Sequence, residues 1–95
     1  MSTDEQLDNE FRSQLAHLEK IGWALEQEMH QLQHELRRVR DGIEREGGVG
    51  HSLEQRATHL EDNIKLCENE LKHNLKQQAG VSKQLKKLQN VINDG

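Results

Sequence analysis

The 95-residue chain contains no proline, no tyrosine, and only one phenylalanine, one tryptophan and one cysteine. The absence of proline removes the residue that most often interrupts a helix. A chain this short buries too little surface for an ordinary globular core, and so few aromatic side chains exclude an aromatic one. With 32% hydrophobic and 32% charged residues, the composition favours long exposed helices over a sheet or a compact globule.

Long apolar runs are also missing. No stretch approaches the roughly 20 residues that span a bilayer, and the start MSTDEQLDNE has neither the basic flank nor the apolar stretch of a signal peptide. The single cysteine, Cys67, cannot form an internal disulfide, which agrees with a reducing compartment. We therefore expect a cytoplasmic protein with no membrane span.

Apolar residues recur in alternating steps of three and four, which is the heptad pattern of a coiled coil. The pattern stops at a segment that contains Gly47, Gly48 and Gly50, where glycine supplies the positive φ angles of a chain reversal. We predict a single helical hairpin over residues 1–95, with a helix at 3–46, a glycine-rich turn at 47–50 and a helix at 52–93. The predicted seam consists of Phe11, Leu15, Leu18, Leu25, Met29, Leu32, Leu36, Val39 and Ile43 in the first helix, and Leu53, Ala57, Leu60, Ile64, Cys67, Leu71, Val81, Leu85, Leu88 and Ile92 in the second.

The register of the two stripes predicts an all-α, antiparallel coiled-coil hairpin. Seam residues whose numbers sum to 96 pair a with d positions from Ile43 with Leu53 to Phe11 with Leu85, and two of these layers are polar: Gly22 with Asn74, and Leu18 with Gln78. Off-seam Ile21, Leu75 and Ala79 adjoin these layers, so we expect the seam to shift or loosen there. A polar layer fixes register at some cost in stability, and we therefore expect register control, with a bend or a point of partner entry as the alternative. The structural alternative is a parallel homodimer of one continuous helix, which must carry three glycines at about 1 kcal/mol each.

A two-helix seam offers little core against the entropy of ordering the chain, so we expect two hairpins to pair into a dimeric four-helix bundle. The g positions remote from the turn carry no charge, and they share one side of an antiparallel pair; these residues are Leu7, Gln14, Ile21, Gln77, Gln84 and Val91. The alternative is a monomer that tolerates glutamines there. Outward-facing Trp23 and Leu66 are further candidates for partner contacts, although Trp23 could equally pack across its own helix.

Catalytic, cofactor and metal sites are not expected. His30 and His34 have the i, i+4 spacing of a metal-binding pair, but HEMHQLQHEL is not an H-E-x-x-H motif and no third ligand converges on it. Cys67 falls in the seam, where a small buried residue is the ordinary interpretation. The carboxylates lie on two exposed helices with no pocket to desolvate them, which argues against acid–base catalysis.

The stretch from Arg45 to Gly47 and on through Leu53 to Thr58 resembles the turn region of antiparallel Rho-GTPase-binding fingers, although the glycines are additional and the arms are longer. The main hypothesis is a non-enzymatic interaction or scaffolding module that binds itself or another helical protein. One alternative is a monomeric regulatory or adaptor finger, GTPase-effector-like or chaperone-like. The other is a small nucleic-acid binder that uses Lys72, Lys76, Lys83, Lys86 and Lys87, but that strip lacks the aromatic platforms of single-strand binders.

Overall fold

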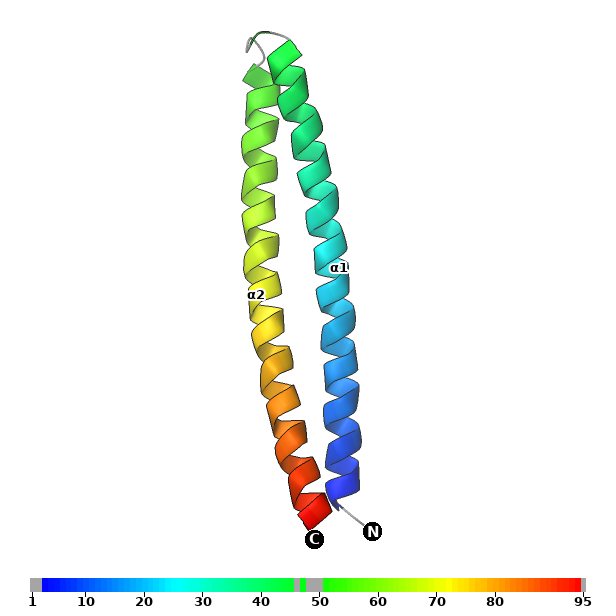
Figure 1. Cartoon of the computed structure of the whole chain (residues 1–95). Helices are drawn as coiled ribbons and strands as arrows, with labels where there is room; N and C mark the ends of the chain where they lie inside the picture. The colour runs from blue at the N-terminus through cyan, green and yellow to red at the C-terminus, as the bar shows by residue number, and fades with distance from the viewer. Residues whose placement is uncertain (1–2, 46, 48–50, 95) are drawn as a thin grey trace. The chain divides into compact units, whose positions relative to one another are not determined.

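The structure, a computed structural model, describes residues 3–45, 47 and 51–94. It contains two α-helices, α1 at Thr3–Arg45 and α2 at His51–Asp94, and no strand within the described ranges (Figure 1). The chain is therefore the predicted all-α helical hairpin and not one continuous helix. Neither helix contains, among the described residues, a stretch long and apolar enough to cross a membrane.

The end of α1 is set by Gly47. This residue has φ of 70°, a left-handed conformation that glycine adopts without a Cβ penalty. Its backbone N–H donates a hydrogen bond to the carbonyl oxygen of Glu44 at 3.2 Å, which satisfies one of the carbonyls left free at a helix end. The other residues of the predicted turn, Gly48, Val49 and Gly50, lie outside the described residues.

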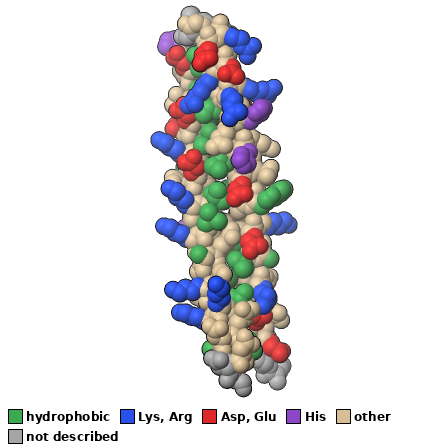
Figure 2. Space-filling view, in the orientation of Figure 1, with side chains coloured by type: hydrophobic (Ala, Val, Ile, Leu, Met, Phe, Trp, Pro, Cys, Tyr) green, Lys and Arg blue, Asp and Glu red, His purple; other side chains and the backbone are tan. Residues whose placement is uncertain are grey.

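The chain divides into two compact units. We call Ala24–Leu71 the turn-half unit, because it contains the chain reversal. We call Met1–Trp23 together with Lys72–Gly95 the open-half unit. In each unit a segment of α1 packs against a segment of α2, with hydrophobic side chains between the helices and charged side chains beside them (Figure 2).

The turn-half unit contains the buried apolar core. Its most buried side chains all come from the predicted heptad seam: Leu36, Val39, Ala57, Leu60, Ile64 and Cys67, each 9% exposed or less. All of these residues except Cys67 form one cluster. Met29, Leu32, Ile43 and Leu53 pack against this cluster. The alternating spacing of three and four therefore places these residues on facing sides of the helices.

Two ion pairs cross between the helices of the turn-half unit, one on each side of the seam. Arg40 contacts Glu61 at 2.7 Å, and Arg56 contacts Glu35. Arg40 and Glu61 both occupy e positions, whereas Glu35 and Arg56 both occupy g positions, as an antiparallel register with pairs summing to 96 requires. All four side chains are more than a third exposed, so each pair contributes only about 0–1 kcal/mol.

In the open-half unit the helices are joined by a polar layer. Asn74 is 4% exposed, and its Nδ2 donates a hydrogen bond across to the backbone carbonyl of Leu18 at 2.9 Å. The Nε2 of Gln78 donates to Asn74 Oδ1 at 2.6 Å. Gly22 makes room for this arrangement, because a Cβ there would lie 2.7 Å from Asn74 Oδ1. Asn74 is thus tightly enclosed and its amide is hydrogen-bonded, whereas Leu18 and Gln78 of the neighbouring layer are only half-buried.

Candidate protein-interaction surface

The same heptad seam is buried unequally in the two units. Of the described residues, no buried apolar side chain lies in the open-half unit, where Phe11, Leu15, Leu18, Val81, Leu85 and Leu88 are only half-buried. The difference follows from the residues themselves, because this unit places Gly22, Asn74 and Gln78 in the seam in place of branched apolar side chains. The open-half unit therefore leaves apolar seam surface accessible that the turn-half unit covers.

Exposed hydrophobic side chains are concentrated in the same unit. Of the seven large hydrophobic residues that are exposed among those described, six belong to the open-half unit: Leu7 at 39%, Ile21 at 40%, Trp23 at 64%, Leu75 at 50%, Val91 at 62% and Ile92 at 42%. Leu7, Ile21 and Val91 share the g flank, whereas Trp23 and Leu75 occupy b and e positions on the other side of the hairpin, so the three g residues are the ones that fall on a single surface. The open-half unit is thus the better candidate for partner binding.

Ile92 is the member of the predicted seam that the structure leaves exposed. At 42% exposure it is a surface residue, because the α1 position that pairs with it in the register is Asp4 and not an apolar residue. Leu75 was not among the predicted interaction residues, although it adjoins the polar layers of the seam. Its signal was present in the pattern, since it is an apolar residue at an e position outside the seam.

The uncharged flank, defined as Leu7, Gln14, Ile21, Gln77, Gln84 and Val91, is exposed at every position. The structure gathers its three glutamines around one shallow groove of about 440 Å³. Leu18 and Val81 supply the apolar floor of this groove, which is also lined by His17 and Gly80. Leu7, Ile21 and Val91 do not line the groove; they belong to the same flank by their g positions.

Gly80 is a lining residue that the heptad analysis missed. A Cβ added at this position would meet no atom within 4 Å, so packing within the chain does not require a glycine there. Glycine in a helix interior costs about 1 kcal/mol relative to alanine. A glycine inside a helix was the feature of the sequence that could have identified this residue. Because glycine has no side chain, the groove stays open to the close approach of another backbone.

Trp23 and Leu66, the other two predicted interaction residues, do not belong to the uncharged flank. Trp23 is 64% exposed at a b position of α1, so packing across its own helix covers little of its ring. Leu66 is 60% exposed and belongs to the turn-half unit. Neither residue lines the groove of the uncharged flank.

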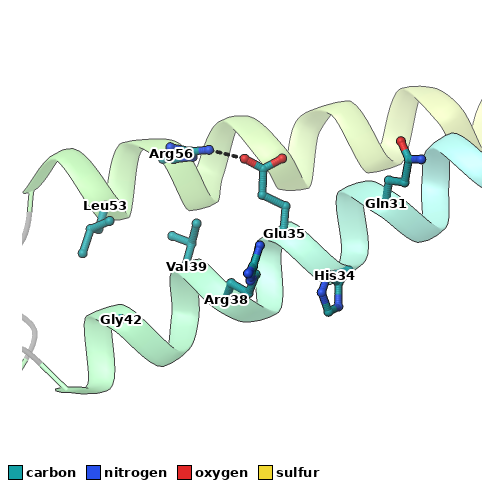
Figure 3. Close-up of a pocket in the computed structure, with 8 residues that line it drawn as sticks. All are labelled: Gln31, His34, Glu35, Arg38, Val39, Gly42, Leu53 and Arg56. Atoms are coloured by element: carbon teal, nitrogen blue, oxygen red, sulfur yellow. Dashed lines mark hydrogen bonds and ion pairs between the residues drawn. The ribbon is translucent and has the colours of Figure 1, made fainter.

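A second groove, of about 490 Å³, lies on the turn-half unit (Figure 3). Its lining is charged, because Arg38, His34 and the ion-paired Arg56 and Glu35 border it. Its apolar floor includes Val39, which the hairpin itself already buries to 8% exposure. This groove is slightly larger than the one beside Gln14 and presents about as much apolar surface, but charged side chains border it, whereas the groove beside Gln14 has none of Asp, Glu, Lys or Arg in its lining.

Cys67 is a buried free cysteine. Its surroundings favour the protonated thiol over the thiolate. Burial raises the pKa of the Cys67 thiol above its ordinary value of 9.0, and the nearby carboxylates of Glu28 and Glu70 raise the pKa further. Because the thiolate is the nucleophile, this environment suits a packing residue and not a catalytic one.

The histidines of α1 do not form part of a ligand cluster. His30 and His34 are both exposed, and within residues 3–45, 47 and 51–94 no three His, Cys, Asp or Glu side chains gather as metal ligands would.

The fold and surface thus define a helical hairpin with an incompletely covered seam at one end. Comparisons of the chain with protein-family models, with curated proteins and with solved structures give no match.

Proposed function

We propose that this protein is a non-enzymatic coiled-coil interaction module, which scaffolds helical assemblies by self-association through the uncharged flank of its open-half unit. The observation that carries the proposal is the contrast between the two units. The same heptad pattern buries six seam side chains to 9% exposure or less in the turn-half unit and none of its apolar seam residues in the open-half unit.

Covering the open-half seam favours association. Burial of apolar surface stabilises by about 25 cal/mol per Å², and the floor of the groove beside Gln14 presents Leu18 and Val81 to a partner. The glutamines around it form hydrogen bonds without the desolvation cost of a charge. A second helical pair laid on this flank completes the four-helix arrangement in which such hairpins bury their seams.

The proposed assembly works in the cytoplasm, in keeping with a single cysteine that is buried and protonated. Neither a catalytic residue nor a cofactor is part of the proposal.

The test is to charge the flank. The double variant Ile21→Glu with Val91→Glu places two carboxylates among the uncharged residues, and sedimentation equilibrium should show the monomer at concentrations where the parent chain is a dimer. Leu66→Glu, compared with Ile21→Glu alone, is the matched control, because each introduces one carboxylate at an exposed apolar residue and Leu66 belongs to the other unit. An unchanged dimer in the Ile21 and Val91 variant would contradict the proposal.

A second candidate function rests on Trp23. Its 64% exposure and the enrichment of tryptophan in binding hot spots favour a monomeric adaptor finger that captures another protein. A folded monomer whose tryptophan fluorescence shifts on addition of a partner would select this function over self-association.

A further inference from the structure

The charges of the open-half unit are divided between its two helices. Residues 3–23 of α1 contain five acidic residues, Asp4, Glu5, Asp8, Glu10 and Glu19, against Arg12 and Lys20. The α2 segment from Lys72 to Asp94 contains five lysines against one carboxylate, that of Asp94. The ion pair within the α1 segment, Arg12 with Asp8 at 2.8 Å, is intrahelical. One arm of this unit is therefore acidic and the other is basic.

Two of these charges border the uncharged flank. Glu10 of α1 and Lys87 of α2 occupy c positions, which lie next to the g positions on the helix surface, and both are exposed. Their numbers sum to 97, so they lie at nearly the same level of the hairpin on opposite borders of the flank. The groove with its floor of Leu18 and Val81 opens between the two helices on this side.

Two copies that meet through one shared surface are related by a two-fold axis. If that axis runs along the helices, α1 of each copy lies against α2 of the other, and Glu10 faces Lys87 of the second copy at both borders. If the axis runs across the helices, α1 lies against α1 and α2 against α2. That arrangement brings the lysine-rich segments of the two copies together.

We propose, building on the self-association proposed above, that the uncharged flank receives a second copy of this chain in the parallel orientation, with α1 of each copy against α2 of the other. The apolar groove supplies affinity, since it is the same in both orientations. The opposed charges select the orientation, because like charges placed together across an interface disfavour it. Gly80 lines the groove on α2, the helix that faces the acidic arm of the second copy in this orientation.

The first experiment tests the border charges. In the parallel orientation Glu10→Lys sets two ammonium groups against each other at both borders of its own dimer, and Lys87→Glu sets two carboxylates against each other in the same way. Each variant alone should dissociate at concentrations about tenfold higher than the parent chain. An equimolar mixture should pair as tightly as the parent, since both contacts are then of opposite charge. Glu19→Lys and Lys86→Glu are the matched controls, because they make the same changes at e and b positions on the other side of the hairpin.

The second experiment reads the orientation directly. In a Cys67→Ala background, Gln14→Cys and Gln84→Cys are made as separate proteins, mixed, and treated with a short bismaleimide crosslinker. The parallel orientation predicts crosslinks from position 14 of one chain to position 84 of another, and crosslinks between equal positions only would overturn it while leaving self-association intact. A monomer at every concentration, seen as a single-chain mass without crosslinks, would instead overturn self-association and the orientation together.

Discussion

Two glycines lie inside the helices of the open-half unit, and their surroundings are opposite. Gly22 sits against the polar layer, where an added Cβ would lie 2.7 Å from Asn74 Oδ1 and 3.0 Å from Gln78 Nε2. Gly80 borders open space. The first glycine is therefore required by packing within the chain, and the second is not.

Alanine substitution should separate these two roles. Gly22→Ala gains about 1 kcal/mol of helix propensity, but it displaces the Asn74 amide from its hydrogen bonds, and overpacking costs about 1–3 kcal/mol. We expect a net loss of about 1 kcal/mol in the free energy of urea unfolding. Gly80→Ala, the control, should gain about 1 kcal/mol in dilute protein. Equal gains in both variants would show that the polar layer does not constrain Gly22.

Cys67 should make the free energy of unfolding of the hairpin depend on pH in the alkaline range. The pKa of the folded thiol is raised by burial and then by Glu28 and Glu70, so above pH 9.0, its ordinary pKa, the unfolded chain releases a proton that the folded chain retains. The free energy of unfolding should then fall as pH rises above this value and stay unaffected by the thiol below it. Urea midpoints at pH 7.5 and 9.5 measure the fall, and Cys67→Ala should lack this part of it. The same fall in both proteins would assign it to other groups.

At the scale of the elements, heptad spacing predicted both helices and their antiparallel pairing, because side-chain periodicity along a helix is a local property of the sequence. Leu36 and Leu60 are buried where the pattern placed them. The contact of Asn74 with the backbone carbonyl of Leu18 could not be predicted, since any residue offers such a carbonyl. The groove beside Gly80 was missed because its depth depends on the sizes of neighbouring side chains and not on their period.

The polar layer should hold the two helices in register. Asn74 matches leucine in size, so Asn74→Leu fills the same space with an apolar side chain, and we expect a gain of about 1 kcal/mol in stability with a loss of register specificity. A heptad slip changes the sum of paired residue numbers from 96 to 103. In a Cys67→Ala background, Leu15→Cys with Leu88→Cys should crosslink within one chain only when Asn74→Leu is present.

The pair Leu15→Cys with Val81→Cys is the control, because it reports the register seen in the structure and should crosslink in both backgrounds. If Asn74→Leu leaves the slipped pair as unreactive as the parent does, the polar layer is not what fixes the register.

At the scale of the whole molecule, the two units differ in how much apolar surface they leave exposed to solvent. The turn-half unit covers its own seam with Leu36, Val39 and Ile64, whereas the open-half unit keeps its seam half-buried and exposes most of the large apolar side chains. Sequence patterning identified the uncharged flank in advance, since charge is read residue by residue. A loosened seam was predicted at Leu18, whereas the incomplete burial of Val81 was not foreseen, because burial depends on how closely two helices pack.

The most direct test of this account is the molar mass of the unaltered protein, measured by light scattering over a series of concentrations. The account predicts a mass that rises to that of two chains and stays there, with intrachain crosslinks between residues whose numbers sum to about 96. A mass of one chain at every concentration would contradict self-association and leave the hairpin as a monomeric binding finger.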